Sequence, residues 1–133
     1  MLKTVCNLIF RLYAYSDATK IIHYSTNSNH THQLCDEIRD TILDFVDDLA
    51  EQSFGIIGKP SFNDMELTSD ITVSDNLDGI CTDAMASVED YYSKCTKDPK
   101  MTPIVSLIDD FNGKMSQKKF LATFDKHSNY KNK

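Results

Sequence analysis

The chain has few of the residues that build phosphate-binding loops and cysteine-ligated metal sites. Only four of its 133 residues are glycines, and none belongs to a GxGxxG or P-loop pattern. The cysteines lack CxxC spacing, which favours free buried thiols over a zinc or disulfide framework. No nucleophile-elbow motif is present either. These absences argue against a nucleotide-binding loop and against a serine or cysteine hydrolase. The four cysteines are Cys6, Cys35, Cys81 and Cys95.

Long apolar runs and an excess of positive charge are also missing. No stretch of about 18 apolar residues occurs, so the sequence predicts no membrane span. Asn7, Arg11 and Asp17 interrupt the opening segment, and no small-residue cleavage site follows it. We therefore interpret this segment as mature structure rather than as a secretion signal. The net charge of −6 argues against a nucleic-acid-binding protein and suits one that attracts cations. We expect a cytoplasmic protein.

Apolar residues recur at helical spacing in four segments, which begin near residues 2, 30, 75 and 102. Glycines and a proline within residues 55–60 end the second segment. Residues 59–74 form a connection, in which "DITV" (70–73) has a strand-like pattern. The pattern predicts an all-α fold, with residues 1–133 forming one four-helix bundle domain and the longer connection lying between its second and third helices.

Successive residues of an α-helix are rotated by about 100° around its axis. In this projection the residues of the second helix fall on three faces. One face is apolar and predicts the contact with the core: Leu34, Ile38, Ile42, Phe45 and Leu49. A second is acidic and predicts a solvated surface: Glu37, Asp44 and Asp48. The third points away from the core and mixes metal-ligand types with apolar residues: His32, Asp36, Asp47 and Glu51 with Leu43, Ala50 and Phe54. This mixture predicts a contact with another chain.

The spacing within the third face indicates a shared metal site. His32 and Asp36 are one helical turn apart, as are Asp47 and Glu51, so each pair suits one ion. The two pairs are about 22 Å apart along the axis, so one helix cannot bring both to the same ion. Two copies packed antiparallel about a two-fold axis would place each His32 opposite the partner's Asp47. His23, at the end of the preceding helix, would add a second imidazole.

The ligand types narrow the choice of metal, and a simpler interpretation stays open. Nitrogen and carboxylate ligands without cysteine suit iron, manganese or zinc better than a soft metal. In the simpler interpretation, the carboxylates form a solvated acidic face and the histidines cap helix ends.

These residues resemble the Dps family of mini-ferritins. That family has "HW" near the end of its first helix, then a histidine, an aspartate four residues later, and a D-x-x-A-E pattern further along the second helix. The corresponding text here is "HY" at His23–Tyr24, then His32, Asp36 and "DDLAE" at Asp47–Glu51. The exit "GIIGKP" and the last helix, "IVSLIDDFNGKMSQKKFLATFDKH", are also similar.

The resemblance implies a ferritin-like bundle that forms a homodimer through its second helix and, in the family, a shell of twelve subunits. It implies that the chain is a ferroxidase, which oxidises ferrous iron with peroxide or oxygen, sequesters iron and protects its host from oxidation. Iron would be the metal, with zinc or manganese as alternatives. One subunit would supply His23, His32 and Asp36, its two-fold mate Asp47 and Glu51, and Tyr24 would donate an electron.

Two departures from the family leave a second function open. The interval from His23 to His32 is nine residues, shorter than in the family, and residues 59–74 leave little room for the family's short extra helix. Such a shortened chain is compatible with a viral or phage origin, which would place it in the cytoplasm of a bacterial host. The alternative function is that of a non-enzymatic ferritin-like dimer that binds a protein or small ligand and has lost iron oxidation. A structural metal at the same site is a third interpretation.

The C-terminal end is basic. Its last twenty residues contain one acid, Asp125, and six lysines: Lys114, Lys118, Lys119, Lys126, Lys131 and Lys133. Such a segment can make non-specific contacts with phosphates. We interpret residues 126–133 as a flexible basic tail and expect DNA binding to be weak or absent.

Overall fold

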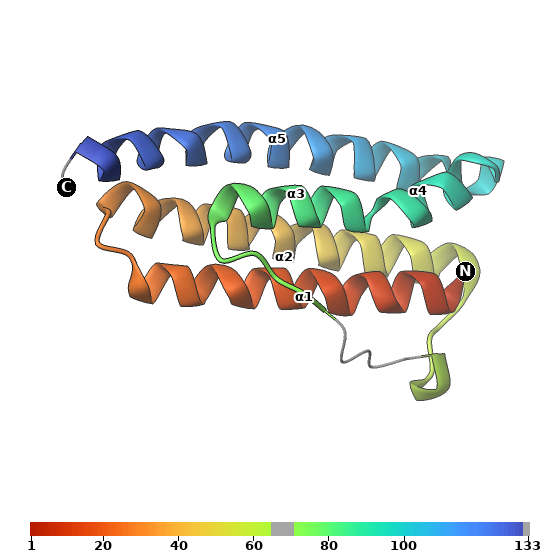
Figure 1. Cartoon of the computed structure of the whole chain (residues 1–133). Helices are drawn as coiled ribbons and strands as arrows, with labels where there is room; N and C mark the ends of the chain where they lie inside the picture. The colour runs from red at the N-terminus through yellow and green to blue at the C-terminus, as the bar shows by residue number, and fades with distance from the viewer. Residues whose placement is uncertain (65–70, 132–133) are drawn as a thin grey trace.

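The computed structural model describes residues 1–64 and 71–131, with side chains as far as Phe124, and within these ranges it contains helices and no strand (Figure 1). Four helical rods form a bundle, which confirms the prediction of an all-α four-helix bundle. The first two rods are an antiparallel hairpin, the third runs parallel to the second, and the fourth returns (Figure 1). The rods are α1 (Leu2–Ser25), α2 (Asn29–Ile57), α3 (Leu77–Ser87) continued by α4 (Glu89–Thr96), and α5 (Thr102–Lys131).

The long connection joins α2 to α3, as predicted. It leaves α2 beside the N-terminus and reaches α3 at the opposite end of the bundle (Figure 1). It contains one short helical turn, Phe62–Asp64, and Ile71 and Val73 pack partly buried against the core. The strand-like interpretation of "DITV" is wrong for residues 71–73, which have no regular structure, because helices surround them and offer no strand to pair with. Asp70 lies outside the described residues.

Local capping residues fix the bounds of α2 and α3. The Ser28 side chain accepts a hydrogen bond from the Thr31 N–H, and the Asn76 side chain accepts one from the Gly79 N–H. At the other end of α2, Gly58 adopts φ 108°, the one positive φ among the described residues, and its N–H donates to the Phe54 carbonyl. A residue with a side chain rarely adopts this conformation, so a glycine ends the helix here.

The third rod is one helix in the sequence pattern and two in the structure. The break falls at Val88, whose backbone (φ −83°, ψ −11°) does not continue the hydrogen-bond ladder. The hydroxyl of the preceding Ser87 donates to the Ala84 carbonyl at 2.7 Å, a local bond that competes with helix continuation. Val88 stays fully buried, so the core contact survives the break.

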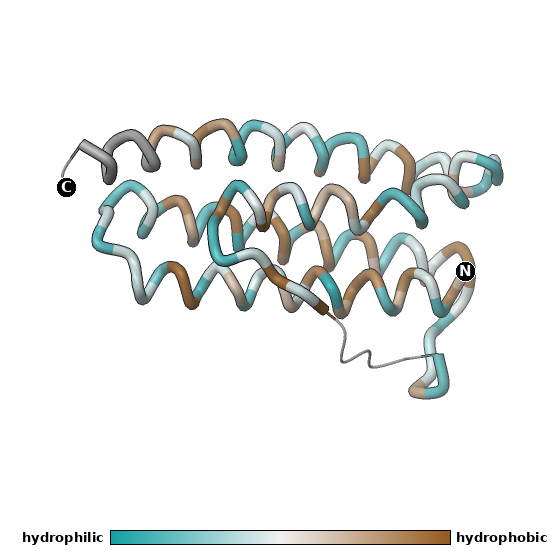
Figure 2. Tube along the Cα trace, in the orientation of Figure 1, coloured by the Kyte–Doolittle hydropathy of each residue, from teal (hydrophilic) through white to brown (hydrophobic). Residues whose placement is uncertain are grey.

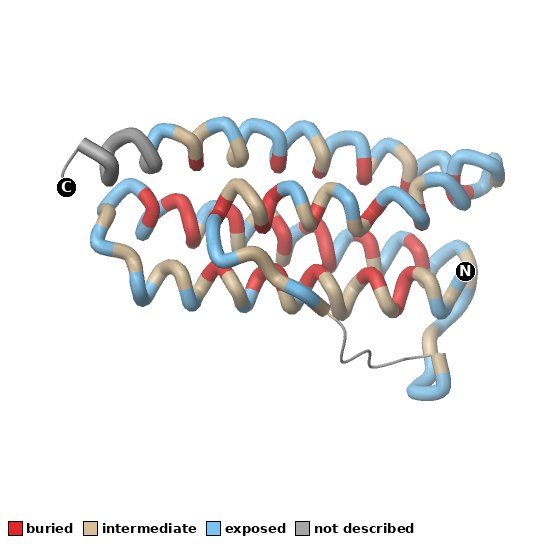
Figure 3. The backbone as a smooth tube through the Cα atoms, in the orientation of Figure 1, coloured by how far each residue is buried: buried red, intermediate tan, exposed pale blue. Residues whose placement is uncertain are grey.

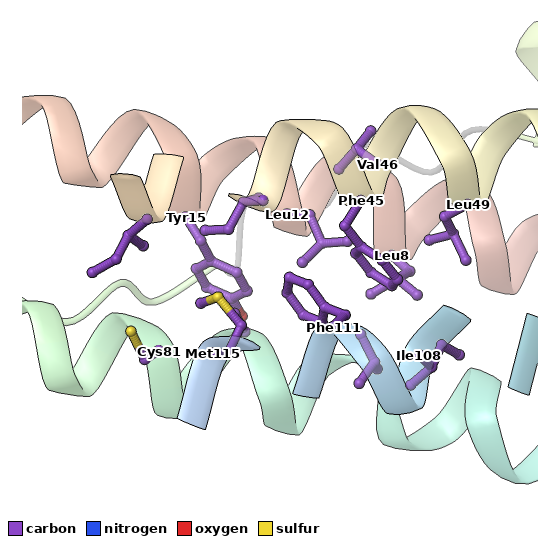
Figure 4. Packing of buried hydrophobic residues seen from close by; sticks show 14 of the residues in the cluster. Leu8, Leu12, Tyr15, Phe45, Val46, Leu49, Cys81, Ile108, Phe111 and Met115 are labelled. Carbon is purple, nitrogen blue, oxygen red and sulfur yellow. The ribbon is translucent and has the colours of Figure 1, made fainter. Parts of the chain in front are cut away.

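The core lies along the mutually facing sides of the rods. Hydrophobic positions recur along each helix (Figure 2), and the buried positions face the bundle's interior (Figure 3). Phe45 of α2 stacks on Phe111 of α5, with ring centroids 3.9 Å apart and Leu12 of α1 nearby (Figure 4). The predicted core face of α2 is buried throughout: Leu34, Ile38, Ile42, Phe45 and Leu49.

Two further features bear on function. Among the described residues, no helix is long and apolar enough to cross a membrane. The last helix, α5, continues to Lys131. Residues 132 and 133, and all side chains from Asp125 onward, lie outside the described part, so the flexible basic tail stays a prediction.

Candidate functional site

The turn between α1 and α2 brings His23 and His32 together. Their imidazoles stack with ring centroids 3.7 Å apart and an interplanar angle of 25°. The connection is short: Thr26 is extended and its hydroxyl accepts the Ser28 N–H at 3.1 Å, and only three residues separate α1 from α2. The shortened His23–His32 interval therefore does not keep His23 away from His32.

Reciprocal hydrogen bonds fix both rings. The Nδ1 of His23 lies 2.9 Å from the His32 carbonyl oxygen, and the Nδ1 of His32 lies 3.0 Å from the His23 carbonyl oxygen. A carbonyl oxygen only accepts, so each Nδ1 carries the proton and donates it. In the neutral form of each ring, the lone pair is then on Nε2. Metal-binding histidines show this same arrangement, in which a backbone carbonyl holds the opposite nitrogen.

Asp36 joins the histidine pair, together with a cation that the sequence analysis missed. The Asp36 Oδ1 lies 3.5 Å from the His23 Nδ1 and accepts a hydrogen bond from the Lys20 Nζ at 3.1 Å. The hydrogen bond from Lys20, with a smaller contribution from the nearby histidines, lowers the pKa of Asp36 below its ordinary value. The contact between Lys20 and Asp36 could have been predicted from the register of the hairpin. In an antiparallel pair of helices that aligns His23 with His32, residue 20 aligns with residue 35 or 36.

Tyr24 lies beside this cluster and extends into solvent. Its ring is 75% exposed, yet it has two neighbours. The edge of the His23 ring meets it at a centroid distance of 5.3 Å, and the Lys20 Nζ is 5.7 Å from its centroid. Tyr24 is therefore an exposed aromatic side chain with one aromatic and one cationic neighbour.

The structure does not bring Asp47 and Glu51 to the histidines within one chain. Both are exposed on α2, and neither makes a hydrogen bond or ion pair with any described residue. They lie fifteen and nineteen residues beyond His32, or about 22 and 28 Å along the helix axis. Within the described part of one chain, no group of three histidine, cysteine or acidic side chains is placed to hold a metal ion.

A small apolar groove lies on the outer side of the hairpin, at the level of Asp47. Its volume is about 190 Å³. We call it the α1–α2 groove; its walls include Ile9, Phe10 and Tyr13 of α1 with Val46, Ala50 and Phe54 of α2, and Asp47 is the one charged lining residue among those described. Ala50 and Phe54 of the predicted third face of α2 therefore form a concave surface together with α1.

Other predicted features have structural roles. All four cysteines are free and buried, as predicted, and Cys35 is 1% exposed in the core rather than facing His32. The ring Nε2 of His30 lies 3.0 Å from the Leu121 carbonyl oxygen, which joins α2 to α5. Of the C-terminal lysines, Lys114 pairs with Asp110 and Lys118 lies 3.9 Å from Glu37, so acids partly offset this basic surface.

Comparison with known proteins identified no matching family model, curated protein or solved structure.

Proposed function

We propose that this protein is a Dps-like ferroxidase that binds ferrous iron between two copies of the chain. One observation carries the proposal. The hairpin holds two histidines and Asp36 at one end of the outer face of α2, and Asp47 and Glu51, at the other end, have no partner among the described residues. An antiparallel second copy would place the acids of one chain against the histidines of the other.

The chemistry of the side chains suits iron. Each half-site would contribute the imidazoles of His23 and His32 and the Asp36 carboxylate, which are neighbours but do not by themselves form a three-ligand set. Asp47 and Glu51 would add two carboxylates. Nitrogen and oxygen donors of this kind bind iron, and also manganese or zinc. The carboxylates would favour the product, because the harder ferric ion prefers oxygen ligands. Each ferrous ion gives up one electron, and one hydrogen peroxide takes up two electrons and two protons to form two water molecules.

The connectivity of the bundle agrees with this proposal. Two helical hairpins joined by one long crossover are the arrangement of ferritin-like bundles, in which carboxylates and histidines of facing helices bind iron. The shell of twelve subunits that the resemblance implies belongs to the same proposal. The native mass of the purified protein tests it.

One observation favours the non-enzymatic alternative. Lys20 already neutralises Asp36 within a single chain, so the polar cluster is satisfied without a metal ion. A dimer that keeps its interface and has lost iron oxidation would retain such an ion pair. The two functions differ in whether His32 and Glu51 are needed for turnover.

Anaerobic titration with ferrous iron, followed by addition of peroxide, tests the proposal through the absorbance of the ferric product. Rapid oxidation is expected for the wild-type protein, and its loss is expected in His32→Ala and in Glu51→Ala. Asp48→Asn is the matched control, since this acid lies on the solvated face of the same helix. Oxidation no faster than in buffer would overturn the ferroxidase and leave the non-enzymatic dimer and the structural metal site.

Mixing the two inactive variants tests whether the site is shared. In a heterodimer of His32→Ala and Glu51→Ala chains, one of the two sites receives both intact halves. Random exchange of subunits would restore about a quarter of the wild-type sites. Activity that stays absent in the mixture, under conditions where subunits exchange, would contradict a site that combines His32 of one chain with Glu51 of the other.

A further inference from the structure

The outer side of the hairpin carries an exposed aromatic side chain at one end and an apolar groove at the other. Tyr24 is 75% exposed, and its ring neighbours are His23 and Lys20. The α1–α2 groove, about 190 Å³ in volume, is apolar except for Asp47. An exposed tyrosine has only two side-chain torsions to fix and so loses little conformational entropy on binding, which is typical of interface anchors.

The register of the hairpin relates these two features. Tyr24 and Ile9 are fifteen residues apart on α1, and His32 and Asp47 are fifteen residues apart on α2. The helices are antiparallel, so Tyr24 lies near the level of His32, while Ile9 and Asp47 both line the groove. In a two-fold dimer that places His32 opposite the partner's Asp47, Tyr24 therefore lies at the same height along the helix axis as the partner's groove. Both spans are about 22 Å along a helix axis.

The two features also lie on one side of α1. Tyr24, Tyr13 and Phe10 fall within about 60° of one another around the helix axis. An isologous dimer requires this, because each chain must present both the ring and the groove on the same surface.

Charges along α2 suit the same operation. The midpoint between His32 and Asp47 falls between Arg39 and Asp40. The Arg39 Nε is buried and has no hydrogen-bond partner among the described residues, and Asp40 is exposed. A two-fold axis at this midpoint would bring each guanidinium close to the partner's Asp40, which gives two opposite-charge contacts across the axis.

We propose that Tyr24 of each chain inserts its ring into the α1–α2 groove of a second copy, so that two such contacts hold the dimer in the register needed for the shared site. The inference rests on the proposed function for the choice of register. It makes Tyr24 an interface anchor, a role separate from electron donation. The contact is reciprocal: each chain gives one ring and receives one.

Sedimentation of single variants is the first test. Tyr24→Ala removes the ring, and Ala50→Phe fills the groove. A buried aromatic anchor contributes about 30-fold to an association constant, so the loss of both copies should raise the dimer dissociation constant about 1,000-fold. Phe120→Ala is the matched control, because Phe120 is a 61% exposed aromatic that belongs to α5 and lines neither the groove nor the histidine cluster. Its dissociation constant should equal that of the wild-type protein.

A mixture of the two variants separates a contact between chains from a folding defect. The Tyr24→Ala chain keeps an open groove, and the Ala50→Phe chain keeps its tyrosine, so their heterodimer regains one of the two contacts. The mixture should associate about 30-fold more tightly than either variant alone. A mixture no tighter than its components, or a Tyr24→Ala protein that dimerises like the wild type, would overturn the inference.

The outcomes also distinguish this inference from the proposed function. If dimerisation depends on Tyr24 but the protein oxidises no iron, the role of Tyr24 at the interface stands and the ferroxidase proposal is overturned. If the protein oxidises iron and the Tyr24→Ala variant dimerises as tightly as the wild type, the ferroxidase proposal stands and the tyrosine contact is overturned. A wild-type protein that stays monomeric at high concentration would overturn both.

Discussion

At the scale of single residues, Lys20 and a bound metal ion would compete for the carboxylate of Asp36. Their hydrogen bond lowers the pKa of Asp36, which means that Lys20 stabilises the ionised carboxylate. An ionised carboxylate is the form that binds a metal, but the ammonium group occupies one of its oxygens. Lys20 therefore keeps the ligand charged while restricting access to it.

Removing the lysine separates these two effects. In Lys20→Gln, we expect the pKa of Asp36 to rise toward its ordinary value and ferrous iron to bind more tightly at neutral pH, where the carboxylate remains ionised. Carboxyl chemical shifts followed through a pH titration measure the first effect, and anaerobic iron titration measures the second. Lys94→Gln is the control, since Lys94 pairs with Asp90 on α4. An unchanged Asp36 pKa would contradict this account.

Tyr91 makes a buried hydrogen bond between side chains of the third rod and α2. Its hydroxyl donates to the Ser53 Oγ at 2.8 Å, and both residues are almost fully buried. Tyr91→Phe leaves the Ser53 hydroxyl without this partner, so we expect a loss of about 1–2 kcal/mol in the free energy of unfolding. Urea denaturation measures it. Tyr13→Phe, at a 41% exposed ring, should change stability little.

The same tyrosine predicts a loss of stability at alkaline pH. Burial raises the pKa of Tyr91 to about 12, from about 10 in an unfolded chain. Between these values the folded state binds more protons than the unfolded state, so stability falls as the pH rises. Wild-type protein should therefore lose stability more steeply above pH 10 than Tyr91→Phe. Equal slopes would show that other groups, such as the buried Cys81 thiol, account for the decline.

At the scale of secondary-structure elements, two glycines near the end of α2 should respond to alanine in opposite directions. Gly58 has φ 108° and ψ 165°, a region that residues with side chains avoid at a cost of about 1–3 kcal/mol. Gly55 lies inside the helix, where alanine is favoured by about 0.5–1 kcal/mol. A methyl group would meet no atom within 4 Å at either site, so backbone conformation alone decides. Urea denaturation should show Gly58→Ala destabilised and Gly55→Ala stabilised; equal effects would refute this explanation.

Periodicity predicted the elements well because burial and helical spacing are coupled along α2. Its apolar positions, from Leu34 to Leu49, are those that the structure buries. The break at Val88 escaped prediction because Val88 keeps the core periodicity, so the apolar pattern runs through it unchanged. For the site, periodicity placed His32 and Asp36 on one face of α2. Finding Lys20 required the register between α1 and α2, which a single-helix projection does not contain.

At the scale of the whole molecule, the α1–α2 hairpin contains every residue that the proposals use. The histidines and Tyr24 lie at one end of it and the acids and groove at the other, while α3, α4 and α5 bury its inner side. The histidines with Tyr24 and the acids with the groove lie at opposite ends of the same hairpin. A change in the angle at which two copies pack therefore moves the tyrosine contact and the metal ligands together. Association and metal binding should therefore be thermodynamically linked.

Ferrous iron should accordingly tighten the dimer. If each of two sites takes ligands from both chains, iron binds the dimer in preference to the monomer. Free iron at ten times its dissociation constant would then strengthen association about 100-fold. Anaerobic sedimentation with and without iron measures the shift. His32→Ala should abolish the shift, whereas Tyr24→Ala should weaken the dimer but keep the iron-dependent gain, since it removes an anchor and leaves the ligands. A dimer whose dissociation constant ignores iron would place any bound metal within single chains and away from the two-fold interface.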